Sequence, residues 1–157
     1  MTTSATRLRD VMEAHRGGDL PALTDELVRA CDPVRDLGDG LSIAEVAEVT
    51  GTTAHTLRYY ERIGLVDVDR DAAGRRTYSR EALGRIVFIT KLRLSDMPIR
   101  NIQQYVELVK LGDSTVPERL EIMERHRSVI QSRLEDMQWA LAVIDYKIST
   151  YGGNCQP

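Results

Sequence analysis

The longest regular pattern in the chain lies between residues 117 and 151. Apolar side chains there recur at spacings that alternate between three and four, and only Arg127 interrupts them. Such a pattern, sustained over about four heptads, predicts one long helix with a coiled-coil seam. We expect a second copy of the chain to cover this seam, which makes these residues dimerisation candidates: Leu120, Met123, Ile130, Leu134, Met137, Leu141, Ile144 and Ile148.

Two features modify this seam. Arg127 either sets the register or pairs with an acid across the seam, or it extends its charged end into water from the interface edge. Trp139, Val143 and Tyr146 are expected to flank the seam and to widen its apolar face.

A pair of short helices is indicated between residues 41 and 64. In "LSIAEVAEVTG", Ser42 is placed to cap a helix, Glu45 to complete a capping box, and Gly51 to end it. A second short helix is expected in "TTAHTLRYYERIG", which Gly64 ends. Two short helices joined by a tight turn that contains glycine predict a helix-turn-helix.

A small β-hairpin is expected next. "LVDVDRDAAGRRTYS" alternates at Val66 and Val68, turns at "DAAG" and returns through "RRTY". Helices are expected at about residues 81–93, and from Pro98 to about Leu111. The fold class is therefore mainly α: a winged helix-turn-helix with a small β-hairpin wing, followed by the long coiled-coil helix.

Charge is unevenly distributed along the chain. The net charge of −3 and the pI of about 5.6 argue mildly against nucleic-acid binding. Residues 53–93, however, carry nine basic and five acidic side chains, a net of +4, whereas residues 1–40 carry five basic and eight acidic ones, a net of −3. Because salt screens charge beyond roughly 8–10 Å, the local basic region decides whether DNA is attracted.

Several functions are disfavoured by the residues that such functions need. Cys31 and Cys155 are far apart and form no CxxC, so we expect no disulfide framework, no zinc site and no cofactor. No nucleophile constellation, paired-carboxylate site or phosphate-binding glycine loop can be assembled, so an enzyme is not expected. We read no signal peptide and no membrane span, and expect a cytoplasmic protein.

The segments "LSIAEVAEVTGTTAHTLRYYERIGLV" and "GRRTYSREAL" resemble the MerR family of bacterial transcription regulators, and the resemblance covers roughly residues 41–151. It implies a winged helix-turn-helix DNA-binding domain at 41–112 and a coiled-coil dimerisation helix at 113–151. Residues 152–157 are expected to be a flexible tail. Residues 1–40 lie outside the resemblance and are expected to be a weakly helical extension with a linker, of unknown role.

In this arrangement the first helix lies across the DNA backbone and the N-terminal end of the second helix enters the major groove. The DNA-binding candidates are Ser42, Thr52, Thr53, His55, Thr56, Arg58, Tyr59, Tyr60, Arg75, Arg76 and Tyr78. Arg58 suits phosphate or guanine, and the two wing arginines suit phosphate or the minor groove. The alternatives are core packing for Tyr60 and Tyr78, and solvated surface charge for Arg58 and Arg76.

The resemblance further implies a homodimer on an inverted repeat within a promoter spacer, where distortion of the DNA lets RNA polymerase engage. Metal-sensing members carry cysteines at the start of the dimerisation helix and in a loop after it. Here only Cys155 follows that helix, so we expect no metal, and the inducing signal and any effector stay open. Two other functions are weighed: an architectural or excisionase-like DNA-bending protein, and a protein-interaction module without promoter regulation.

Overall fold

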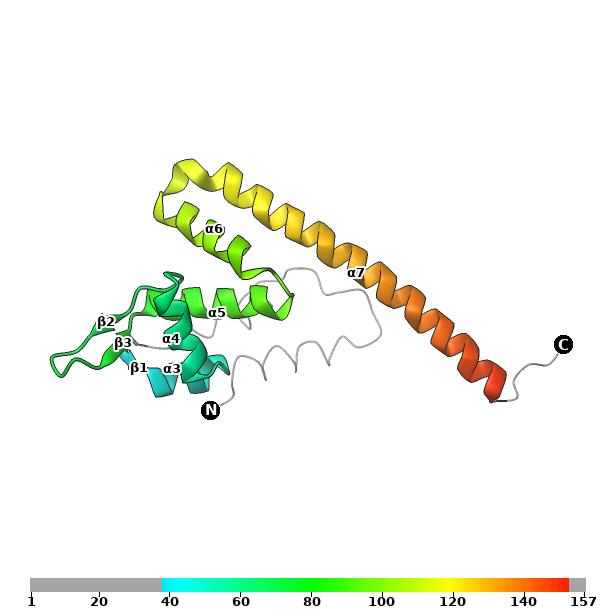
Figure 1. Ribbon diagram of the computed structural model, residues 1–157, viewed down its shortest axis with the longest axis horizontal. Coiled ribbons are helices and arrows are strands. Elements are labelled where there is room, and N and C mark those ends of the chain that lie inside the picture. The colour runs from blue at the N-terminus through cyan, green and yellow to red at the C-terminus, as the bar shows by residue number, and fades with distance from the viewer. Residues whose placement is uncertain (1–37, 153–157) are drawn as a thin grey trace. The chain divides into compact units, whose positions relative to one another are not determined.

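The computed structural model describes residues 38–152. Most of the extension expected at residues 1–40, and Cys31 and Cys155, lie outside them. Within the described residues the order is β1 (Leu41–Ser42), α3 (Ile43–Thr50), α4 (Ala54–Arg62), β2 (Asp69–Arg70), β3 (Arg76–Tyr78), α5 (Arg80–Leu94), α6 (Ile99–Lys110), the 3-10 turn η1 (Asp113–Thr115) and α7 (Val116–Tyr151) (Figure 1). Over residues 38–152 the protein is mainly helical with one small sheet, as the sequence predicts.

The capping box predicted at the start of α3 is confirmed. The Ser42 side chain accepts a hydrogen bond from the Glu45 backbone N–H at 3.4 Å, and the Glu45 carboxylate accepts from the Ser42 backbone N–H at 2.7 Å. These bonds satisfy two backbone donors that a helix start leaves unpaired. Gly51 ends α3 with a φ of 68°, a left-handed conformation that glycine adopts without strain.

Helix α4 begins after a turn of three residues. Thr53 caps α4 by accepting from the Thr56 backbone N–H at 3.1 Å. Helices α3 and α4 pack on each other, and α3 also packs on α5. Their contact surfaces supply the core of this part of the chain, whose fully buried side chains include Val46, Leu57, Leu65, Leu83, Ile86 and Ile89.

The wing is shorter than predicted and belongs to a sheet of three strands. Strand β3 pairs antiparallel with β2 on one side and with β1 on the other. Strand β1 is not expected from the sequence, because its two residues directly precede α3 and Ser42 reads as a helix cap. This pairing connects the wing's return strand to the first residues of the helix-turn-helix.

The described chain separates into two compact units, residues 38–103 and residues 104–152. The division falls inside α6, whereas the expected domain boundary lay at 112/113. The C-terminal part of α6 belongs with η1 and α7: the Thr115 hydroxyl lies 2.6 Å from the Leu108 carbonyl oxygen and 2.8 Å from that of Gly112. Thr115 is buried, so these contacts fix the turn between α6 and α7.

Helix α7 runs for 36 residues from Val116 to Tyr151, as its repeat predicts. One expectation about the faces of this helix is corrected. At about 100° per residue, Trp139 lies about 140° and Val143 about 180° around the helix from Leu134. These side chains, with Tyr146, therefore form a second apolar stripe on the far side of α7 and do not widen the seam.

Candidate nucleic-acid interface

Four of the candidate DNA contacts, Thr52, Thr53, His55 and Thr56, lie at the N-terminal end of α4. The structure shows which of them already bind another side chain of the protein. The Thr52 hydroxyl lies 3.3 Å from the hydroxyl of Thr90 on α5, and the Thr53 hydroxyl lies 2.9 Å from that of Thr56. Of the four, Thr53 and His55 are exposed, and Thr52 and Thr56 are half-buried. The hydroxyls of the three threonines help to position the helix start, so the exposed imidazole of His55 is the side chain of this group that we expect to reach a base edge.

The tyrosine candidates are mainly core residues. Tyr78 is fully buried and Tyr60 is only 6% exposed, so core packing, the alternative weighed from the sequence, describes both rings. Desolvation raises the pKa of each above its ordinary value; for Tyr78 the nearby carboxylate of Glu61 contributes as well. Both phenols therefore stay neutral at physiological pH, and neither ring lies at the surface to contact DNA.

Tyr59 and the two arginines beside it are more accessible. The Arg62 guanidinium lies 5.4 Å from the centroid of the Tyr59 ring, a cation–π contact, and the Tyr59 and Tyr60 rings are 6.1 Å apart. Arg58 is exposed, and no ion pair ties it to another of the described residues. Arg58 is thus the α4 cation most available to a phosphate, as its place in the motif predicts.

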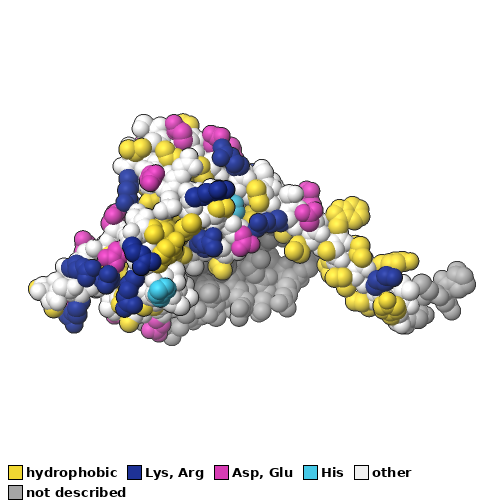
Figure 2. All heavy atoms as spheres, in the orientation of Figure 1, with side chains coloured by type: hydrophobic (Ala, Val, Ile, Leu, Met, Phe, Trp, Pro, Cys, Tyr) yellow, Lys and Arg dark blue, Asp and Glu magenta, His cyan; other side chains and the backbone are white. Residues whose placement is uncertain are grey.

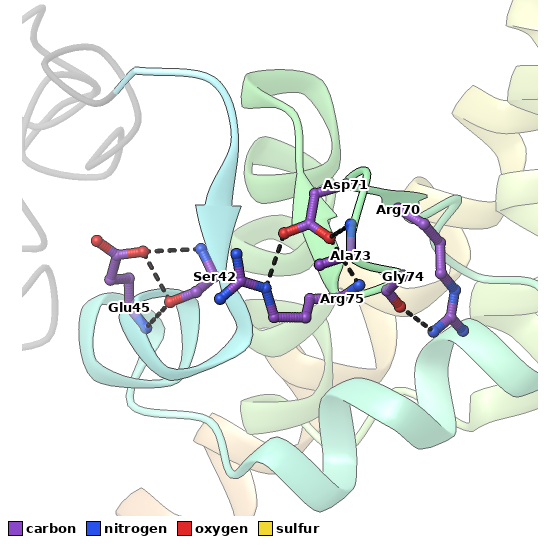
Figure 3. Close-up of polar contacts among 7 residues, drawn as sticks. All are labelled: Ser42, Glu45, Arg70, Asp71, Ala73, Gly74 and Arg75. Atoms are coloured by element: carbon purple, nitrogen blue, oxygen red, sulfur yellow. Dashed lines mark hydrogen bonds and ion pairs between the residues drawn. The ribbon is translucent and has the colours of Figure 1, made fainter.

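The tip of the wing is closed by Asp71 (Figure 3). The Asp71 carboxylate accepts from the backbone N–H groups of Ala73 at 2.9 Å and of Arg75 at 2.8 Å, and from Arg75 Nε at 2.8 Å. These bonds, first of all the one from the Arg75 backbone, hold the pKa of Asp71 below its usual value. Gly74 completes the turn with a φ of 76°. The turn holds the Arg75 side chain, which is 80% exposed, at the wing tip.

The two other wing arginines pair with one carboxylate of α4. Arg76 Nε donates to Glu61 Oε2 at 2.5 Å, and Arg70 Nη2 lies 3.4 Å from Glu61 Oε1. The hydrogen bond to Glu61 raises the pKa of Arg76. The side chain of Arg76 is 28% exposed, against 80% for its neighbour Arg75. The two adjacent arginines, which are equivalent candidates in the sequence, therefore have different surroundings.

The basic region therefore presents less positive charge to solvent than its number of Lys and Arg residues suggests. Arg85 also lies within ion-pair distance of Asp67 and Glu81, at 3.5 and 3.0 Å. Figure 2 nevertheless shows Lys and Arg side chains gathered over the end of the domain that carries the wing and α4. Among the site candidates, Arg58 and Arg75 are the basic side chains most open to solvent.

Ser42 has a different role from these cations, because its side chain takes part in the capping box of α3. Its hydroxyl donates to Glu45 Oε2 at 2.7 Å within the capping box (Figure 3). We assign it to the start of α3, where it orients the helix.

Sequence reasoning missed Glu61, Arg62 and Arg70 as members of this region. An acid within a basic cluster is a weak signal, and its partners lie nine and fifteen residues further on, spacings that no local helix or strand pattern connects. The Arg62–Tyr59 contact has a helical spacing of three and was open to prediction.

The second candidate surface is the seam of α7. Leu120, Leu134, Met137, Leu141, Ile144 and Ile148 all have about half or more of their surface exposed, from 49% for Leu134 to 71% for Met137. Met123 and Ile130 are half-buried, and Arg127 is exposed. Figure 2 shows the hydrophobic side chains lining the later part of α7. An apolar surface of this extent is typical of a protein–protein interface.

Within residues 38–152, no cluster of three or more His, Cys, Asp or Glu side chains is placed to hold a metal ion. Over the same residues, none of the helices is apolar over a length sufficient to cross a bilayer.

The two short helices, the three-stranded wing sheet and the exposed arginines define a winged helix-turn-helix protein. Residues 41–108 match the model of the MerR HTH family of regulatory proteins. The HTH-type transcriptional regulator AdhR of Bacillus subtilis is 41% identical over 92 residues, which cover 57% of this chain and 66% of that protein.

Solved structures agree with this match. A putative MerR family transcriptional regulator from Listeria monocytogenes is 35% identical, with a TM-score of 0.68 over 71% of this chain and 86% of that one. HiNmlR, a MerR family regulator lacking the sensor domain and bound to promoter DNA, is 28% identical, with a TM-score of 0.66 over 73% and 91%. The chain belongs to the MerR family: it is a DNA-binding transcriptional regulator, and its family consists of regulators and not of enzymes.

Proposed function

We propose that the protein binds an inverted repeat in a promoter as a homodimer and controls transcription initiation by distorting the spacer DNA. The observation that carries this proposal is the combination, in one chain, of a winged helix-turn-helix with exposed cations and a long helix with an exposed apolar seam. The first supplies one DNA-reading half and the second joins two such halves.

The seam supports a homodimer on energetic grounds. Fully burying a Leu, Ile or Met side chain stabilises an interface by about 1.5–3 kcal/mol, and α7 offers eight such side chains at seam spacing. A pair of identical helices buries the same set twice. Because a two-fold axis relates the two DNA-binding domains of such a dimer, the expected target has matching two-fold symmetry.

Distortion of the DNA is supported by the family and by the small set of base-reading side chains. His55 is an exposed candidate at the start of α4, while the arginines suit the phosphate backbone, which carries little sequence information. Specificity with few base contacts is typical of proteins that read how readily DNA deforms. HiNmlR, a MerR family regulator bound to promoter DNA, supports the promoter-binding part of the proposal.

RNA polymerase is the functional partner that this mechanism requires, and the cytoplasm is where a bacterial promoter is found. The architectural alternative is not favoured, because AdhR and the Listeria protein are transcription regulators.

The test begins with duplexes selected by the purified protein from a randomised pool, together with mapping of bound sites in the source genome. The proposal predicts a dyad-symmetric motif located between promoter elements, and a protein–DNA stoichiometry of one dimer per motif. A motif without dyad symmetry, or binding with no preference over a scrambled duplex, contradicts it.

A further inference from the structure

We propose that Glu61 is a positioning residue for DNA recognition: it holds both strands of the wing against the recognition helix α4, so that helix and wing read DNA as one rigid unit. The inference rests on the proposed DNA-binding function and deepens it. It concerns a side chain that carries the same charge as DNA and so contributes no direct attraction to it.

The geometry places one carboxylate between three elements. Glu61 is in the last turn of α4, Arg70 is in β2 and Arg76 is in β3. Arg76 Nε lies 2.5 Å from Glu61 Oε2, and Arg70 Nη2 lies 3.4 Å from Glu61 Oε1, so each carboxylate oxygen contacts a different strand. The carboxylate therefore ties both wing strands to α4.

The surroundings strengthen this contact. The side chains of Glu61 and Arg76 are only 22% and 28% exposed, so water screens the pair less than it screens an open surface pair. The buried hydroxyl of Tyr78, on the same strand as Arg76, has no hydrogen-bond partner within the described structure and lies in the field of the same carboxylate. Strand β3 is thus held in two ways: its Tyr78 is buried in the core, and its Arg76 is paired with Glu61.

Beyond the Glu61 contacts, the hairpin meets the rest of the domain through β3, which pairs with β1 and packs on α3 and α5. The hairpin is short: β2 has two residues and β3 has three. Its tip is closed within itself by Asp71, a contact that orders the turn and does not connect it to α4. Strand β1 pairs with β3 on the side opposite β2, and the Glu61 contacts tie β2 and β3 directly to α4. Without these contacts, we expect the tip that carries Arg75 to move relative to His55 and Arg58.

This role predicts that removing Glu61 has opposite effects on binding to a scrambled duplex and on binding to the selected duplex. Removing a carboxylate beside a DNA-binding surface strengthens attraction to any duplex, because one repulsion of the phosphates is lost. Loss of wing position acts in the opposite direction on the selected site alone. Glu61→Ala is therefore expected to bind a scrambled duplex as well as or better than the wild type, and to bind the selected duplex more weakly by on the order of tenfold, comparable to one mismatched base pair.

The matched control is Glu48→Ala, which removes the same charge from an exposed position on α3. Titrations of all three proteins are run on the duplex selected by the wild type and on its scrambled version, at several salt concentrations. Glu48→Ala is expected to keep the wild-type preference for the selected duplex. If Glu61→Ala keeps it too, the positioning role is overturned.

A charge-swapped pair of variants distinguishes loss of this contact from poor folding. Glu61→Arg and Arg76→Glu alone each place like charges together, and each is expected to lose the preference. The double variant restores the pair between α4 and β3 but sets two arginine side chains together at Arg70, so it is expected to recover part of the preference. Equal loss in the double variant overturns the proposal.

Hydrogen exchange of the β3 backbone amides supplies a readout without DNA. Glu61→Ala is expected to speed this exchange, and Glu48→Ala is expected to leave its rate unchanged. If the wild type distinguishes no duplex, the proposed function fails, and this exchange measurement still decides the role of Glu61.

Discussion

The hydroxyls of Thr52 and Thr90 lie 3.3 Å apart, so the residue that leads into the recognition helix is tied to the middle of α5. Thr52 was a candidate for base contact, and the structure gives its hydroxyl a partner inside the protein. His55, three residues later, is exposed. The two positions are therefore expected to affect different properties.

Thr52→Val removes one side of a part-buried hydrogen bond and is expected to lower the free energy of unfolding by about 1 kcal/mol, without changing which sequence is preferred. His55→Ala is expected to relax sequence preference at one position of each half-site, with little change in stability. Thermal unfolding and selection from a randomised duplex pool, applied to both variants, separate the two effects. A changed preference in Thr52→Val returns that residue to the base-reading set.

The wing tip is expected to respond to pH through Asp71. Hydrogen bonds, first from the Arg75 backbone, lower the pKa of this carboxyl in the folded protein. Its contribution to wing order is therefore present above the unfolded pKa, about 3.9, and is lost as pH falls through the lower folded value. The amide resonances of Ala73 and Arg75 report the loss directly.

In Asp71→Ala the wing tip is expected to be mobile at all pH values, while the melting temperature of the domain changes little. Asp71→Asn keeps a side-chain acceptor for the backbone donors but loses the charge, and is expected to hold the turn without this acid transition. An unchanged pair of amide resonances in Asp71→Ala contradicts the role of Asp71.

The more exposed and the less exposed wing arginine, Arg75 and Arg76, are expected to differ in salt dependence. Each phosphate neutralised by a cation contributes about 0.9 to the slope of log K against log salt concentration. Arg75→Ala and Arg58→Ala are each expected to lower the slope by about that amount and to weaken binding to all sequences. Arg76→Ala is expected to weaken the selected site with a smaller change of slope, because its guanidinium pairs with Glu61 and is only 28% exposed, whereas Arg75, although paired with Asp71, is 80% exposed. Equal slopes for Arg75→Ala and wild type remove the wing tip from the phosphate contacts.

The α7 seam predicts a face-specific effect on assembly. Leu134→Asp places a charge in the middle of the proposed interface and is expected to yield monomers at micromolar concentrations. Val143→Asp adds the same charge to the same helix, about 180° from Leu134, and is expected to leave the dimer intact. Sedimentation velocity distinguishes the species. Dimeric Leu134→Asp together with monomeric Val143→Asp assigns the interface to the second apolar stripe.

The parts of the fold that the sequence predicts are those governed by local rules. The capping box of Ser42 and Glu45, the left-handed Gly51 and the repeat of α7 all depend on residues within one or two turns of each other. Strand β1, by contrast, exists only because it pairs with β3, more than thirty residues away in sequence. Periodicity within a segment carries no information about such a partner.

The candidate site shows the same division. Membership of His55, Arg58 and Arg75 in an exposed region is predicted by the motif and its charge. The burial of Tyr60 and Tyr78 and the pairing of Arg76 with Glu61 depend on how the wing folds back on α4, which no spacing in the sequence specifies. Arg75 and Arg76 are adjacent and chemically identical, yet only the tertiary structure distinguishes them.

The most direct test of the proposed function is a footprint of the purified wild-type protein on its selected genomic site. A dimer with two recognition helices predicts protection of two half-sites related by a dyad, on successive major grooves, with enhanced cleavage between them where the DNA is distorted. Protection of a single half-site, or a uniform footprint without a dyad, contradicts the proposal of a dimeric, DNA-distorting regulator.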